Sequence, residues 1–205
     1  DLKLVNESIA FYKEQGDPHT RRGLETLAAL YYEQGDYLNS IVFNENLLLM
    51  DVNHIKAPTY EISVVEALKM AHKENDSLNR LFNSIAKYPK AVKEGVKAFE
   101  DLLWKYAVQT HAEAQRTKNM DLYQISRRLY EKYLEYYPTS PSSAKGRFQL
   151  AEILYKQSHY SEAATQYYLV YKSPTSGELK FDGIKNALMS LDRDLNLKRK
   201  KMGLA

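Results

Sequence analysis

The chain has 205 residues, of which 44% are apolar and 27% charged, and its formal net charge at neutral pH is +3. This composition predicts a folded chain with a real core, and the charge is too small to indicate a nucleic-acid-binding protein. The absence of cysteine excludes disulfides and thiolate chemistry. No apolar run reaches the ~18 residues of a membrane span. No signal peptide is visible, and because the chain starts at Asp1 within an amphipathic pattern, we expect a piece of a longer protein.

The first half of the chain is a series of amphipathic segments with apolar side chains at helical spacing. They predict helices over residues 2–14, 22–34, 37–50, 58–73 and 78–87. Gly16–Pro18 and Gly35–Asp36 are expected to stop the first two helices, and Asn75–Ser77 is expected to form a turn with a helix cap. Pro58 suits the first turn of the helix that it opens.

The second half continues the same pattern. Residues 90–117 contain no proline and keep helical spacing, which predicts one long helix; further helices are expected over residues 120–137, 142–157, 161–172 and 179–191. Residues 192–205 lack a clear apolar face, and Lys198–Lys201 is interpreted as part of a solvated basic tail. The total is about ten helices joined by short turns, which predicts an all-α fold of antiparallel helical hairpins.

Small residues recur twelve positions apart within these predicted hairpins. The pairs are Ala28 and Ser40, Ala114 and Ser126, and Ala151 and Ala163. Such spacing places a small side chain where the two helices of a hairpin cross, because a larger one would force them apart. The sequence therefore predicts a repeated hairpin, with a period of 37 residues between the last two units.

The segments QLAEILYKQSHYSEAATQYYLVY and LEYYPTSP carry a family resemblance. With their Leu-Ala, aromatic, turn, Ala and Pro positions they resemble tetratricopeptide repeats. The resemblance implies one α-solenoid over residues 1–205, in which hairpins stack as a right-handed superhelix. In this interpretation residues 1–89 form divergent hairpins, 90–117 a long interrupting helix, 118–191 the best-matching repeats and 192–205 a tail. The register of the 58–88 unit stays open.

The resemblance also implies a binding surface. The first helices of such hairpins line a concave groove that usually holds a peptide or a partner's helix. The groove positions that carry over are Arg22, Glu25, Ala29, Tyr32, His111, Gln115, Lys118, Lys145, Phe148, Gln149, Glu152 and Lys156. Their mixture of lysine, glutamine and phenylalanine suits a partly acidic protein or peptide partner. The positions of the carboxylate clamp found in co-chaperone repeats are not matched here, which disfavours a receptor for chaperone tails.

The 17 tyrosines have two interpretations. Those at the packing positions of the repeat are expected between helices, where the ring is buried and the hydroxyl needs a partner. These are Tyr130, Tyr133, Tyr137, Tyr167 and Tyr171. Tyr136 and Tyr168 fall off this stripe and are the better candidates for exposed contact with a partner.

No catalytic motif is present, and the five histidines are scattered without metal-ligand spacing. We therefore expect a protein that is not an enzyme and that needs no metal or cofactor. A narrower similarity to periplasmic repeat proteins and lipoproteins implies a protein-interaction scaffold in a bacterial cell envelope, in the periplasm or at the outer membrane. A cytoplasmic regulatory or co-chaperone-like module and a non-catalytic part of a larger enzyme are the alternatives. An RNA-binding repeat is disfavoured by the mixed groove charges.

Overall fold

The computed structural model of the protein describes residues 2–14, 19–93 and 97–203. Within these ranges the chain forms eleven α-helices and no strand. The helices are α1 (Leu2–Glu14), α2 (His19–Glu33), α3 (Tyr37–Met50), α4 (Ala57–Met70), α5 (Glu74–Lys87), α6 (Pro89–Lys93), α7 (Lys97–Thr117), α8 (Met120–Tyr136), α9 (Ser143–Lys156), α10 (Tyr160–Lys172) and α11 (Leu179–Lys201). The short α6 accounts for the difference from the ten helices expected.

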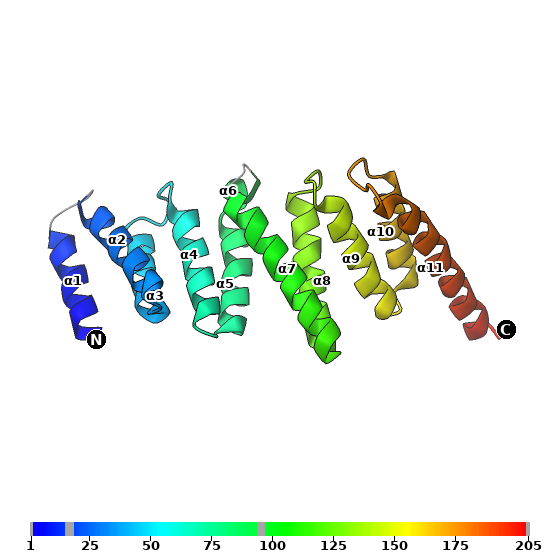
Figure 1. Ribbon diagram of the computed structural model, residues 1–205, viewed down its shortest axis with the longest axis horizontal. Helices are drawn as coiled ribbons and strands as arrows, with labels where there is room; N and C mark the ends of the chain where they lie inside the picture. Colours follow the sequence, from blue (N-terminus) through cyan, green and yellow to red (C-terminus); the bar gives the residue numbers. More distant parts are fainter. Residues whose placement is uncertain (1, 15–18, 94–96, 204–205) are drawn as a thin grey trace. The chain divides into compact units, whose positions relative to one another are not determined.

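The chain divides into two compact units, residues 1–99 and 100–205. In the first unit α2 packs on α3, α3 on α4 and α4 on α5. In the second unit α8, α9, α10 and α11 pack in the same sequential manner. Figure 1 shows neighbouring helices in each unit running up and down, so the all-α fold of antiparallel helical hairpins is confirmed.

Two hairpins of the first unit cross at the same kind of contact. The Ser40 hydroxyl donates to the carbonyl of Ala28 at 2.8 Å, and the Ser77 hydroxyl donates to the carbonyl of Val65 at 2.7 Å. Each pair is twelve residues apart, and both serines are buried. A serine at the crossing lets the helices approach and satisfies its own hydroxyl. This contact sets the register of the 58–88 hairpin, which the sequence left open, and shows that both hairpins share one crossing geometry.

The crossing expected between Ala114 and Ser126 is wrong in its register. The Ser126 hydroxyl donates at 3.0 Å to the carbonyl of Ala107, 19 residues earlier in the chain. The crossing contact thus lies two helical turns nearer the start of α7 than predicted. Ala107 and Ala114 are both fully buried, so either alanine satisfies a pattern of small residues, and only the packing distinguishes them.

Tyrosines form much of the core of the second unit. Tyr123, Tyr130, Tyr133 and Tyr167 are at most 2% exposed, which confirms the packing interpretation for the last three. The Tyr133 hydroxyl donates to Glu100 at 3.0 Å and also bonds to Ser140, so its polar end is satisfied inside the unit. By contrast Tyr168 is 45% exposed, as expected.

A buried carboxylate links α4 to α5. Glu61 is 3% exposed and accepts hydrogen bonds from Arg80 at 2.5 Å, from Lys87 at 3.2 Å and from Ser84 at 3.2 Å. Arg80 also reaches Glu45 at 3.3 Å. A buried charge is tolerated only when it is paired and hydrogen-bonded, and Glu61 meets this condition through two cations and a hydroxyl.

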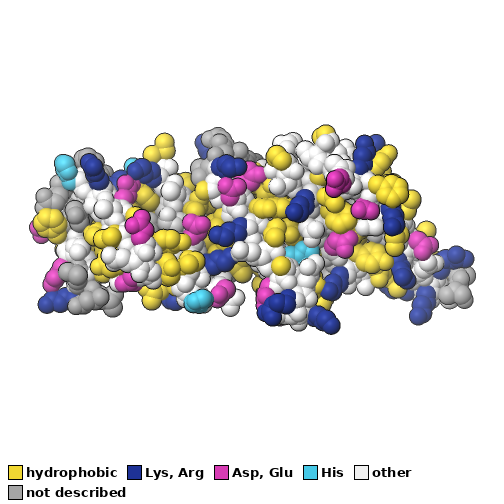
Figure 2. Space-filling view, viewed as in Figure 1, with side chains coloured by type: hydrophobic (Ala, Val, Ile, Leu, Met, Phe, Trp, Pro, Cys, Tyr) yellow, Lys and Arg dark blue, Asp and Glu magenta, His cyan; other side chains and the backbone are white. Residues whose placement is uncertain are grey.

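Several helix limits differ from those predicted or fall outside the described ranges, among them the start of α2 at His19 and the end of α4 at Met70. Helix α5 starts at Glu74 rather than after a turn over residues 75–77, because its acidic first turn favours a helix start and Ser77 faces inward. Helix α11 continues to Lys201 instead of ending at Leu191, since no breaker precedes Gly203, which has a positive φ of 71°. The basic side chains that close α11 are visible at its end in Figure 2. The stop at Gly16–Pro18 and residues 94–96, within the predicted long helix, lie outside the described residues.

Candidate functional site

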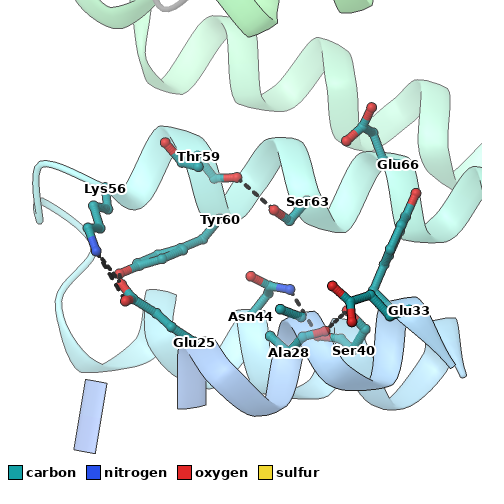
Figure 3. A pocket seen from close by; sticks show the side chains of 12 residues that line it. Glu25, Ala28, Glu33, Ser40, Asn44, Lys56, Thr59, Tyr60, Ser63 and Glu66 are labelled. Carbon is teal, nitrogen blue, oxygen red and sulfur yellow. Dashed lines mark hydrogen bonds and ion pairs between the residues drawn. The ribbon is translucent and has the colours of Figure 1, made fainter. Parts of the chain in front are cut away.

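Helices α2 and α4 enclose a hollow of about 480 Å³, which we call the N-terminal hollow. Its walls are formed by residues of α2 and α4 and by Lys56, just before α4, and its floor by Ser40 and Asn44 of α3. This placement follows from the hairpin pattern: alternate helices flank the hollow, and the helix between them closes it below. Figure 3 shows Lys56, Glu25 and Tyr60 at one end, Glu33 and Glu66 at the other, and Asn44 between them.

One end of the N-terminal hollow is a neutralised polar cluster. The Lys56 ammonium donates to the two Glu25 oxygens at 2.9 and 3.1 Å, and the Tyr60 hydroxyl also donates to this carboxylate. Burial alone would raise the pKa of Glu25, but the hydrogen bonds from Tyr60 and Lys56 outweigh it and hold the pKa below its usual value. Burial and the bond to Glu25 raise the pKa of Tyr60 to about 12. The carboxylate therefore stays ionised and the phenol stays protonated near neutral pH.

The second unit has an equivalent hollow of about 460 Å³, which we call the histidine hollow. His111 and Gln115 of α7 face Glu152, Tyr155 and Lys156 of α9 across it, and its lining is completed by Tyr123 of α8 and Tyr160 of α10. As in the first unit, alternate helices form the walls. A polar lining on a shallow concave surface suits hydrogen bonding to an extended chain more than it suits enclosure of a small molecule.

The floor of the histidine hollow holds its polar groups in fixed positions. His111 is 4% exposed and lies edge-on to the rings of Tyr123 and Tyr130, at centroid distances of 5.8 and 5.9 Å. The Lys156 ammonium lies 4.4 Å from the centroid of the Tyr123 ring and donates to its hydroxyl at 2.5 Å. Burial, and then the charge of Lys156, lower the pKa of His111, so the imidazole is neutral at neutral pH.

A smaller hollow of about 250 Å³ lies between α9 and α11. It is lined by Glu152, Tyr155, Tyr167, Asn186 and Met189, and the Tyr167 hydroxyl donates to Glu152. Because Glu152 and Tyr155 also line the histidine hollow, α9 contributes to both. The two hollows of the second unit are therefore neighbours that share a wall on α9.

The groove residues expected from the sequence fall into two groups. Glu25, Ala29 and Tyr32 line the N-terminal hollow, and His111, Gln115, Glu152 and Lys156 line the histidine hollow. The residues that line none of these hollows are Arg22, Lys118, Lys145, Phe148 and Gln149. Phe148 is half-buried instead, with its ring 5.3 Å from that of Tyr167 in an edge-on contact between α9 and α10.

Several lining residues were missed by reasoning from sequence. They are Glu33, Asn44, Lys56, Thr59, Tyr60, Ser63 and Glu66 in the first unit, and Tyr123, Tyr155 and Tyr160 in the second. Most of the first set lie on α4, whose register was not fixed. The twelve-residue spacing of Val65 and Ser77 could have fixed the register of α4. It was not recognised because Val65 stands where the other hairpins carry alanine.

Among residues 2–14, 19–93 and 97–203 no group of three or more histidine or acidic side chains is arranged to hold a metal ion. None of the helices in these ranges combines the length and apolar character needed to span a membrane.

No family model and no curated protein sequence matches this chain. Among solved structures, the chain is similar to BtubC (BKLC) from P. vanneervenii, with 12% identity over 98% of this chain and 91% of that chain and a TM-score of 0.44. It is also similar to two structures of a putative kinesin light chain with nearly identical TPR-like repeats from P. anserina. Both are 14% identical over 88% of this chain and 95% of that chain, with TM-scores of 0.44 and 0.42. These values describe a backbone likeness alone, and the fold assignment stands on the hairpin geometry given above.

Proposed function

We propose that this chain is a non-catalytic scaffold that binds an extended segment of a partner protein in the hollows between alternate helices. The observation that supports this proposal is the histidine hollow, where four groove residues expected from the sequence lie around one concave surface. Two of them, His111 and Gln115, come from one hairpin, and Glu152 and Lys156 come from the next. A segment lying in this hollow contacts both hairpins at once.

The chemistry of the histidine hollow favours a partly acidic segment. Lys156 uses one N–H on the Tyr123 hydroxyl, which leaves two ammonium donors for a ligand. Gln115 adds an amide from the facing wall, at 3.2 Å from the His111 ring. Ammonium and amide donors on facing walls suit a carboxylate or a backbone carbonyl that lies between them, and the neutral imidazole of His111 avoids a second buried positive charge.

We further propose that the scaffold serves in a bacterial cell-envelope assembly. The support is the sequence of the turn and helix start, YPTSP followed by YSEAA, which resembles periplasmic repeat proteins and lipoproteins. Fractionation of cells that express the gene with its natural upstream sequence tests this point. Recovery in the cytosolic fraction contradicts it.

The peptide-binding proposal is tested with peptides selected from a random phage-displayed library on the intact chain. Affinities of the selected peptides are then measured by calorimetry for the parent chain, for Lys156→Gln and for Lys185→Gln, an exposed lysine of α11 that serves as a matched control. We expect Lys156→Gln to weaken binding about tenfold, which corresponds to ~1.4 kcal/mol, and Lys185→Gln to leave it unchanged. Equal affinities for the two variants, or a library that yields no binder, contradict the proposal.

Circular dichroism and melting curves accompany these measurements. Because Lys156 also contacts Tyr123 in the core, the variant is compared with the parent chain at a temperature where both are folded. Gln115→Ala is a second change in the same hollow that does not disturb the contact between Lys156 and Tyr123. Gln115 is exposed, and its hydrogen bond is made to His111. A loss of affinity in both variants assigns binding to the histidine hollow rather than to a change in stability.

A further inference from the structure

The N-terminal hollow has the opposite charge balance from the one that the sequence suggested for the groove. Its lining contains the carboxylates of Glu25, Glu33 and Glu66 and the single ammonium of Lys56, so three negative charges against one positive leave a formal charge of −2. The cation is engaged at one end, where Lys56 donates to both oxygens of Glu25. The uncompensated charge therefore lies at the other end, with Glu33 and Glu66 (Figure 3).

Glu33 and Glu66 come from different helices, the end of α2 and the middle of α4. Neither carboxylate has an ion-pair or hydrogen-bond partner within the part of the chain that the structure describes. The charge of Glu66, after burial, raises the pKa of Tyr32, which places the two groups close together in the hollow. The wall at this end consequently offers two carboxylates with an aromatic ring beside them.

The floor of the hollow supplies an independent feature that points to a ligand. Asn44 is 4% exposed, and its amide nitrogen donates to the carbonyl of Ser40 at 3.0 Å. Its side-chain oxygen accepts no hydrogen bond from any described residue and lies in the hollow between the two charged ends (Figure 3). The oxygen faces the hollow with its acceptor sites free, so it can accept a hydrogen bond from an occupant that brings N–H groups.

We infer that the N-terminal hollow receives an arginine side chain from the bound partner segment. A guanidinium is planar and has five N–H donors, which suits two separated carboxylates and the Asn44 oxygen together, and it can stack on a tyrosine ring such as that of Tyr32. A lysine offers the same charge without the planar stacking. This inference rests on the proposed function in one respect, that the occupant belongs to a partner chain, and it assigns to this hollow a chemistry opposite to that of the histidine hollow.

The test uses the intact chain, labelled with ¹⁵N, and three probes. They are the capped peptide acetyl-Gly-Ser-Arg-Ser-Gly-amide, the same peptide with citrulline in place of arginine, and spermidine. Citrulline keeps the shape of arginine and removes its charge. We expect the arginine peptide to shift the amide signals of Asn44, Ser63 and Tyr32 saturably and to bind about tenfold more tightly than the citrulline peptide.

Variants identify the carboxylates that act. Glu33→Gln combined with Glu66→Gln is expected to lower affinity for the arginine peptide about tenfold. The matched control combines Glu7→Gln with Glu74→Gln, which removes the same charge from exposed positions of the same unit. Equal affinity for the arginine and citrulline peptides, or equal effects of the two double variants, overturns the inference. Spermidine that binds as tightly as the arginine peptide overturns the assignment to a partner's side chain.

The outcome is separable from that of the proposed function. Library peptides whose affinity depends on Lys156, combined with no response of the Asn44 and Ser63 amides to the arginine peptide, remove this inference and leave the scaffold proposal intact. A specific response to the arginine peptide in a chain that yields no library binder confirms the cation site and contradicts the scaffold proposal.

Discussion

The hydroxyl of Ser77 donates to the carbonyl of Val65 at 2.7 Å, and this contact repeats the one between Ser40 and Ala28 in the preceding hairpin. Both serines lie in the second helix of a hairpin, and both donate to a backbone carbonyl of the first helix. The two hairpins thus share one crossing geometry although one of them carries valine where the other carries alanine. As a consequence α4 presents Tyr60, Ser63 and Glu66 to the N-terminal hollow.

Ser77→Leu is expected to lower the free energy of unfolding by about 1–3 kcal/mol, because the larger side chain overpacks a crossing with no free space. Ser77→Ala removes only the hydrogen bond and is expected to cost ~1 kcal/mol. Urea unfolding followed by circular dichroism measures both. Asn83→Leu, at an exposed position of α5, is the control, and a Ser77→Leu variant as stable as this control contradicts the assigned register.

Glu61→Gln is expected to destabilise the first unit by ~2 kcal/mol, because it leaves Arg80 and Lys87 next to a neutral amide in a site where the carboxylate is buried. The cost stays below that of a fully buried pair, since both cations are partly exposed to water. Glu45→Gln removes a charge that contacts the same Arg80 from a half-exposed position, and its expected cost is less than about 1 kcal/mol. Chemical unfolding of the two variants decides the point: equal costs contradict a structural role for the buried carboxylate.

The stability of the second unit is expected to fall on mild acidification because of His111. Burial, with the charge of Lys156, lowers the pKa of this imidazole in the folded chain below the usual 6.5. The unfolded chain therefore binds the proton first, so the stabilising contribution is present above pH 6.5 and is lost as the pH falls through the folded-state value. Tyr123 and Tyr130 pack on the ring and offer no charge that opposes this loss.

Melting curves between neutral pH and about pH 5 measure the effect. His111→Gln is expected to lose a few degrees less in Tm over this range than the parent chain. The exposed His72, replaced in the same way, provides the control and is expected to follow the parent. An identical pH dependence of Tm in the parent chain and in His111→Gln contradicts a buried neutral imidazole.

Helical periodicity and turn residues determined most of the secondary structure. The amphipathic segments around Leu24, Phe43 and Leu150 each form a helix in which that apolar residue is buried, because a helix in water is stabilised mainly by burial of one face. The resemblance to tetratricopeptide repeats, rather than periodicity, implied groove positions for Glu25 and Lys156, and each lines one of the hollows.

Register and charge pairing were decided only by the tertiary structure. Whether Ser126 meets Ala107 or Ala114 depends on how far two helices slide past each other, and both alanines satisfy the local pattern equally well. The sequence likewise shows Glu33, Lys56 and Glu66 as separate charges on three segments. Only the packing of α2 against α3 and of α3 against α4 brings them around one hollow and pairs the lysine with Glu25. Such pairings join residues more than thirty positions apart, beyond the reach of any helical period.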